Sequence, residues 1–128
     1  MRNVIFMMLL AGVSNSATAE WSAVRQNAFD RDYIDRDSIR RDGEIAYMSN
    51  LVNFDRVEVL GNGQRYLSMQ LSRKYDCKNR QLQIIQVSWY AENMGLGPMV
   101  AKDDQPYKWV LYESTVPTQL LWKIACGK

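Results

Sequence analysis

Two cysteines, Cys77 and Cys126, are the residues of this chain with the most specific chemistry. Cys77 lies in the stretch KYDCKNRQLQ, where Lys74, Lys78 and Arg80 are its cationic neighbours. Basic neighbours favour a reactive thiolate, whereas cysteine in other settings binds zinc or forms a structural disulfide. The first question is therefore whether Cys77 is a reactive thiol, a metal ligand or half of a covalent bond.

The chain contains no histidine. This absence excludes Ser-His-Asp and Cys-His nucleophilic systems, because both need an imidazole base. It also excludes histidine-ligated haem, and zinc sites usually contain histidine or several cysteines. We therefore expect no catalytic residue, no metal and no cofactor. The remaining enzymatic alternative is a small hydrolase that uses carboxylates alone, such as Glu92 or Asp104.

An acidic segment at residues 29–44, FDRDYIDRDSIRRDGE, resembles a calcium-binding loop at first sight. An EF-hand needs oxygen ligands at alternate positions, but the fifth position counted from Asp30 is Ile34. Four arginines neutralise the acids locally: Arg31, Arg36, Arg40 and Arg41. We therefore predict a solvated, salt-bridged turn, with a short helical turn over residues 35–39.

The first nineteen residues have the pattern of a signal peptide. The apolar run VIFMMLLAGV at residues 4–13 follows a charged start and precedes Ala17 and Ala19, an A-x-A cleavage pattern. Ten apolar residues are too few to span a bilayer, which needs roughly 20. We expect cleavage between Ala19 and Glu20, and no transmembrane anchor after cleavage.

The remaining residues, 20–128, fit a single small domain by length. No cysteine lies near the cleavage site, so no lipid anchor is expected, and the sequence predicts a periplasmic or secreted protein. Export implies an oxidising compartment, in which Cys77 and Cys126 are expected to pair. The formal net charge of +2 lacks the strongly basic footprint of nucleic-acid binding.

Alternation of side chains between residues 67 and 77 predicts an antiparallel strand. One face carries Leu67, Met69, Leu71, Tyr75 and Cys77, interrupted only by Arg73. The pattern therefore places Cys77 on the buried face. In the next strand, residues 81–91, Leu82 and Ile84 fall on the face opposite to Ile85, Val87, Trp89 and Ala91, so we expect that end to be covered on both sides.

Further strands and one helix complete the predicted fold. The other strand candidates are residues 21–29, 33–34, 44–54, 56–60 and 107–112, with a hairpin turn at Gly61-Asn62-Gly63. The helix begins after Ser114 or Thr115, has Pro117 in its first turn and ends at Gly127, and its apolar face combines Leu120, Leu121, Ile124 and Ala125. The fold class is α+β: an antiparallel sheet with a C-terminal helix packed on it and tied by one disulfide.

Two surface groups are candidate contact sites. The loop NMGLGP at residues 93–98 carries Met94 and Leu96 between glycines, and an apolar loop tip either contacts a partner or folds back on its own domain. The second group is basic and is suited to an acidic partner or a sulfated glycan, or else is a plain solvated strand end. It consists of Arg73, Lys74, Lys78 and Arg80.

The order of several short motifs resembles the surface-adhesin protein E-like domain of Gram-negative bacteria. The motifs are Trp21, the element YIDRDSI at 33–39, Tyr75–Arg80, the Met-Gly-x-Gly loop at 94–97, Trp109-Val110 and the final helix with Cys126. The resemblance covers essentially the whole mature chain. It implies export, an antiparallel sheet with a disulfide, no enzyme activity, and binding of a protein or an extracellular-matrix-type ligand.

Our leading hypothesis is an exported, non-enzymatic binding protein that engages a protein or extended ligand through the sheet or a loop. The alternative is a periplasmic inhibitor or envelope accessory protein that binds one specific enzyme or assembly. The sequence leaves the oligomeric state open.

Overall fold

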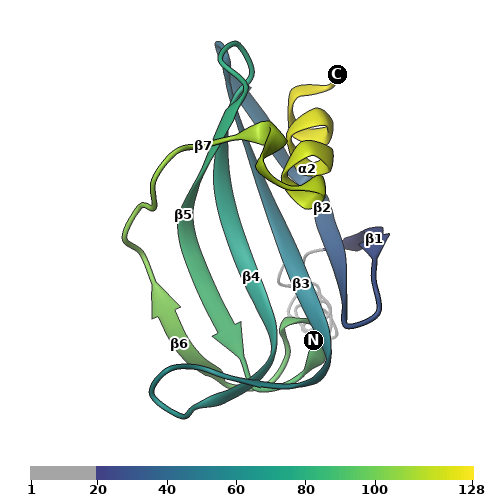
Figure 1. Cartoon of the computed structure of the whole chain (residues 1–128), viewed down its shortest axis with the longest axis vertical. Helices are drawn as coiled ribbons and strands as arrows, with labels where there is room; N and C mark the ends of the chain where they lie inside the picture. The colour runs from purple at the N-terminus through teal and green to yellow at the C-terminus, as the bar shows by residue number, and fades with distance from the viewer. Residues whose placement is uncertain (1–19) are drawn as a thin grey trace, which may run out of the picture.

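The computed structural model describes residues 20–128, so the predicted signal peptide and Ala19 lie outside the described residues. The elements follow the order shown in Figure 1. They are β1 (Trp21–Gln26), β2 (Asp30–Asp42), β3 (Ile45–Val59), β4 (Arg65–Asp76), β5 (Gln81–Tyr90), η2 (Asn93–Gly95), β6 (Met99–Asp103), β7 (Val110–Leu111), η3 (Tyr112–Ser114) and α2 (Val116–Cys126).

The strands form one antiparallel sheet in the order β1-β2-β3-β4-β5-β6, with the short β7 also paired to β5. Each of the first six strands therefore lies beside its neighbour in sequence, as in a chain of hairpins. At the β3–β4 turn, Leu60 N donates to Gln64 O over 2.8 Å, and Gly63 adopts a φ of +88°. The predicted turn at residues 61–63 is thus present, whereas β6 is a strand that the sequence pattern did not predict.

The helix α2 packs across one face of the sheet, at the end where the β2–β3 and β4–β5 turns lie (Figure 1). Thr115 caps it, since its side chain accepts from Thr118 N and the reciprocal bond completes a capping box. Gly127 ends it with a left-handed φ of +70°. The α+β class and the helix boundaries are therefore confirmed.

The main core lies between α2 and this end of the sheet. The buried helix residues are Leu121, Trp122, Ala125 and Cys126, whereas Leu120 and Ile124 of the predicted apolar face are only half-buried. The buried stripe is thus rotated by about one residue relative to the prediction, because the indole of Trp122 enters the core. The sheet contributes Ile34, Ala46, Met48, Tyr75, Cys77 and Leu82 to the same cluster.

Residues 30–42 form the long strand β2, so the turn predicted for residues 29–44 and the helical turn expected over 35–39 were wrong. Pairing with β3 shifts between Asp35 and Arg40, which marks a bulge. Ser38 Oγ stabilises the bulge, because it donates to Asp35 O (2.6 Å) and accepts from Ser49 N (2.9 Å). Contacts with a neighbouring strand thus override the local turn signals of this acidic segment.

A second bulge changes how β5 presents its side chains. Gln86 pairs with Ser72, and the next pair is Ile84 with Arg73, so Ile85 is the extra residue. The extra residue reverses the alternation, and Leu82 and Val87, both buried, lie on the same face. The prediction that Leu82 and Ile84 occupy the opposite face to Val87 was therefore wrong.

Candidate functional site

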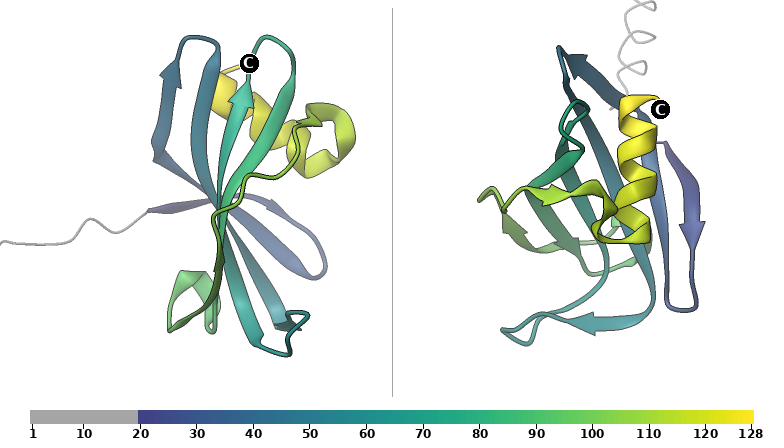
Figure 2. Two further views of the ribbon diagram at one scale, coloured as in Figure 1. Left: turned by 90° about the vertical axis from the view of Figure 1, so that its left-hand side faces the viewer. Right: turned by 45° about the horizontal axis from the view of Figure 1, so that its top comes forward.

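The face of the sheet that α2 does not cover is called here the helix-free face. On β3 and β4 it carries the partners Tyr47 and Lys74, Ser49 and Ser72, and Leu51 and Gln70. Side chains alternate along a strand, so these residues share one side. Its lower end in Figure 2, left, is occupied by the loop that contains η2, which lies on the opposite side of the sheet from α2.

A trough of about 690 Å³ crosses the helix-free face from β2 to the segment after β6. Apart from Ile85, its side chains are polar or amphipathic, and they come from every strand that it crosses. They are Asp37, Ser38 and Arg40 of β2, Tyr47 and Ser49 of β3, Ser72 of β4, Ile85 and Gln86 of β5, and Asp104. Met48 and Arg73, whose side chains point to the other face, complete its floor.

Contacts between neighbouring side chains organise the trough. The guanidinium carbon of Arg40 lies 4.2 Å from the centre of the Tyr47 ring, a cation–π contact. At the other end, Gln86 Nε2 donates to Asp104 Oδ1 over 2.8 Å. The trough therefore presents an aromatic–cation pair at one end and an amide–carboxylate pair at the other.

The two carboxylates of the trough are far apart. Asp37 belongs to β2, and Asp104 is held against β5, so about 14 Å of sheet separates them at three strand spacings. Paired carboxylates in glycoside hydrolysis stand roughly 5–9.5 Å apart. The other carboxylate of the hydrolase alternative, Glu92, does not line the trough. The geometry suits the binding of an extended ligand better than acid–base chemistry.

The loop with Met94 and Leu96 is held firmly on the helix-free face. Asn53 Oδ1 accepts from Met94 N over 2.7 Å, and Ser68 Oγ accepts from Gly95 N over 2.8 Å. A side chain at Gly95 would meet Leu51 at 3.1 Å, so glycine permits this close approach. Met94 is half-buried, whereas Leu96 remains 61% exposed. The loop thus adds an apolar side chain to the same face as the trough.

The structure does not bring the four basic candidates together. Lys74 lies on the helix-free face, beside the strand position of Tyr47, and Arg73 lies on the face of α2. Arg73 Nη1 donates there to the buried Asn50 Oδ1. Lys78 and Arg80 belong to the exposed turn after β4. Of the four, Arg73 contributes to the floor of the trough from the other face, and Lys74 lies beside the lining residue Tyr47.

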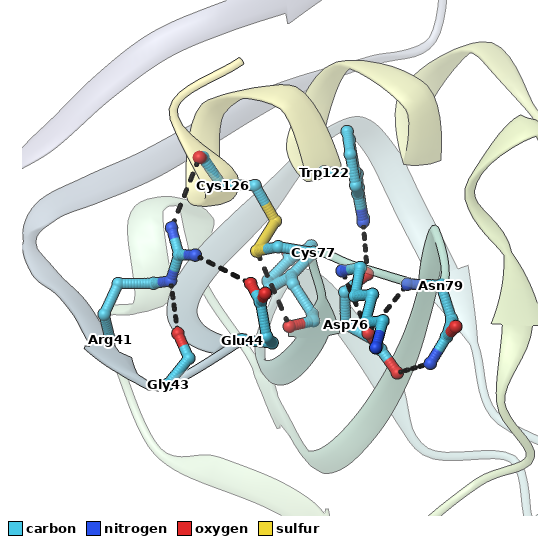
Figure 3. Close-up of a disulfide and its surroundings, with 10 residues drawn as sticks. Arg41, Gly43, Glu44, Asp76, Cys77, Asn79, Trp122 and Cys126 are labelled. Carbon is cyan, nitrogen blue, oxygen red and sulfur yellow. Dashed lines mark hydrogen bonds and ion pairs between the residues drawn. A yellow bond between two sulfur atoms is a disulfide. The ribbon is translucent and has the colours of Figure 1, made fainter.

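Cys77 and Cys126 form the predicted disulfide, with their Cα atoms 5.6 Å apart (Figure 3). The bond joins the end of β4 to the last residue of α2, and both cysteines are buried. Beside it, Trp122 Nε1 donates to Asp76 O over 3.0 Å. The reactive-thiol and metal-ligand alternatives for Cys77 therefore do not apply to the folded, oxidised protein.

Sequence reasoning missed a buried ion pair and most of the trough. Asp32 is buried, and its Oδ2 accepts from Arg25 Nε over 2.7 Å. Burial raises the pKa of Asp32 above its usual value, and the bond from Arg25 opposes that shift. The buried Asp32 and Ile34 alternate with residues that are less buried in β2, so the two-residue period of a strand, applied to the acidic segment, would have identified Asp32 as buried.

Comparisons with known proteins were made over the whole chain. Residues 21–127 match the family model described as surface-adhesin protein E, and the search of curated proteins gives no match. Among solved structures, crystal form II of Haemophilus influenzae protein E is similar with a TM-score of 0.68 and 19% identity, covering 88% of this chain and 91% of that chain.

A second structure of Haemophilus influenzae protein E has a TM-score of 0.66 and 20% identity, with 88% of this chain and 87% of that chain covered. At such identities the likeness supports the fold alone. Within residues 20–128, no helix has the length and apolar character needed to cross a membrane.

Proposed function

The chain belongs to the surface-adhesin protein E family, and on that premise we propose that it is an exported, non-enzymatic binding protein. It engages a protein or another extended ligand through the helix-free face, with the trough at the centre of the contact. The signal peptide at residues 1–19 directs export, and the mature domain, residues 20–128, acts in the periplasm or outside the cell.

The observation that carries this proposal is the trough that spans β2 to β5. Its polar groups are spread along its length, as expected for a surface that contacts an extended partner at several points. Tyrosine and arginine are enriched among the residues that dominate protein interfaces, and Arg40 stacked on Tyr47 supplies both. Leu96 and Lys74 flank the trough with an apolar and a cationic contact.

The binding test compares two variants with the same change of charge. Arg40 is exposed and lines the trough, whereas Arg65 is exposed at the start of β4 and does not line it. Immobilised wild-type protein, Arg40→Glu and Arg65→Glu are incubated with extracellular-matrix proteins and with periplasmic extract. We expect Arg40→Glu to reduce the capture of the partner about tenfold, and Arg65→Glu to leave it unchanged.

The outcome also separates the two functional hypotheses. Equal capture by Arg40→Glu and the wild-type protein would contradict a role for the trough. Capture of a single envelope enzyme, whose activity falls on binding, would replace the adhesin-like function with that of an inhibitor. The exposed loop residue Leu96 is tested in the same way as Leu96→Ser against Val59→Ser, because these side chains are 61% and 60% exposed.

Export and cleavage of residues 1–19 are tested by identifying the first residue of the exported protein. Mass spectrometry of the protein recovered from the periplasm or the medium should give Glu20 as the first residue. Recovery of the intact chain, with residues 1–19 still attached in the membrane fraction, would contradict cleavage.

A further inference from the structure

A second cavity, of about 300 Å³, lies on the face of the sheet that carries α2, beside the first turn of that helix. Leu82 and Ile84 of β5 and Val110 of β7 form apolar walls. Tyr107 holds the covering segment against β5, because its backbone N donates to Ile84 O over 2.9 Å and its O accepts from Gln83 Nε2 over 3.0 Å. The cavity is thus lined by β4, β5, β7, α2 and the segment before β7. It lies on the opposite face of the sheet from the trough, and Arg73 is the residue that lines both.

The charged residues that line this cavity are both cations. They are Arg73 and Lys108, and no aspartate or glutamate lines it. Within residues 20–128, no carboxylate oxygen lies within 4.0 Å of either side chain. The nearby Asp32 is itself paired with Arg25. The guanidinium of Arg73 donates to Asn50 Oδ1 and attracts the Asp32 carboxylate. A guanidinium has five N–H donors, so a ligand carboxylate can still add a charge-assisted hydrogen bond.

The mouth of the cavity exposes apolar side chains. Tyr107 and Val110 line the cavity and are each 42% exposed, and Trp109 between them is 39% exposed. Exposed apolar residues gathered beside a cavity are typical of a ligand site. At about 30 Å³ for each non-hydrogen group, the volume holds roughly ten such atoms.

We propose that this cavity binds a small apolar carboxylate, such as a fatty acid of about eight carbons. The aliphatic tail lies between Leu82, Ile84 and Val110, and the carboxylate faces Arg73 and Lys108. The planar guanidinium matches two carboxylate oxygens at once. This activity is independent of the binding proposed for the helix-free face.

The test titrates the full protein with sodium octanoate at pH 7 and follows the binding by calorimetry. Octan-1-ol has the same chain without the charge, and octylammonium has the opposite charge. We expect octanoate to bind tightest and octylammonium weakest. Lys108→Gln should raise the Kd for octanoate about threefold, because the contact is partly solvated, and should leave the Kd for octan-1-ol unchanged.

Three further variants test whether the binding is specific to the cavity. Lys102→Gln is the matched control, because Lys102 is an exposed lysine on β6 that does not line the cavity. Val110→Trp fills the cavity from its exposed rim and should abolish octanoate binding while the protein still unfolds cooperatively. Arg73→Gln should raise the Kd about tenfold, but this variant also loses the bond to Asn50.

The proposal is overturned if the three octyl compounds bind equally, if Lys108→Gln behaves like Lys102→Gln, or if Val110→Trp retains full affinity. Absence of octanoate binding at millimolar concentration would overturn it as well. None of these results bears on the trough, which Arg40→Glu tests separately.

Discussion

At the scale of a single residue, Asp76 connects the β4–β5 turn to the helix α2 through its hydrogen bonds. Its Oδ1 accepts from Lys78 N (3.1 Å) and Asn79 N (2.9 Å), and its Oδ2 accepts from Asn79 Nδ2 (2.9 Å). Its carbonyl oxygen accepts from the indole of Trp122. The backbone and side-chain bonds from Asn79 are the main reason that the pKa of Asp76 lies below its usual value.

The shift at Asp76 predicts a dependence of stability on pH. A lowered pKa in the folded state means that the carboxylate stabilises the fold above the unfolded value of 3.8. That contribution is lost as the pH falls below 3.8 and through the folded value. Asp76→Asn should therefore lower the free energy of unfolding by about 0.5 kcal/mol at pH 7, a small effect because solvent screens this group.

Urea unfolding of the wild-type protein and Asp76→Asn at pH 7 and near pH 2.5 measures this effect. The difference between the two proteins should shrink toward zero at the lower pH. The control is Asp42→Asn, because Asp42 is exposed and makes no side-chain hydrogen bond among the described residues. A difference that is the same at both pH values would show that the charge of Asp76 does not contribute.

Asp32 should act in the opposite direction. Its pKa is raised, mainly by burial, so it contributes stability at pH values below 3.8 that is lost as the pH rises through its folded value. At neutral pH the Asp32 carboxylate is charged and buried, and the 2.7 Å contact with Arg25 offsets part of the free-energy cost of burying that charge. The stability of the protein at acidic pH therefore depends on two carboxyl groups whose contributions change with pH in opposite directions.

At the scale of the element, the bulge in β5 decides which apolar residues enter the core. Leu82 is 1% exposed, while the bulged Ile85 is half-buried and lines the trough. Strict alternation would instead have put Ile85 beside Val87 in the interior. The bulge thus allows one strand to serve the core on one face and the candidate site on the other.

The bulge predicts unequal costs for two similar truncations. Leu82→Ala removes buried atoms and leaves a cavity, so it should lower the free energy of unfolding by about 3 kcal/mol. Ile85→Ala should cost only about 1 kcal/mol, because its side chain is partly in solvent. Chemical unfolding of both variants measures the difference. Equal costs would mean that Ile85 is buried and that β5 alternates without a bulge.

At the scale of the whole molecule, the disulfide ties α2 to the sheet beside the core that the two layers share. It spans a sequence separation of 49 and closes the core between β4 and α2. The helix covers only one end of the sheet (Figure 2), so a large share of the sheet does not depend on it. The bond therefore stabilises the one region where the two layers meet.

Removal of the disulfide should weaken the domain markedly. We expect the double variant Cys77→Ser/Cys126→Ser to lose about 4 kcal/mol of unfolding free energy, since a loop of this length is no longer closed in the unfolded chain. A domain typically has only about 5–15 kcal/mol in total. Urea unfolding measures the loss, and the oxidised and reduced forms of the wild-type protein provide the comparison. An unchanged unfolding midpoint would contradict this role.

The sequence by itself determined those features that depend on neighbouring residues. Thr115, Pro117 and Gly127 mark the ends of α2 through local hydrogen bonds and backbone angles. The alternation before Cys77 identified the buried face of β4, and the presence of only two cysteines predicted their pairing. Each of these signals lies within a few residues or follows from composition, so no knowledge of the fold was needed.

Only the tertiary structure decided the features that depend on distant partners. Residues 30–42 form a strand because β3 pairs with them on both sides of the bulge between Asp35 and Arg40. Ile85 bulges because β4 sets the register of β5. The trough gathers Asp37, Tyr47 and Asp104 from separate parts of the chain. Local propensity is weak compared with such pairing, so neither candidate binding site could be assembled from the linear sequence.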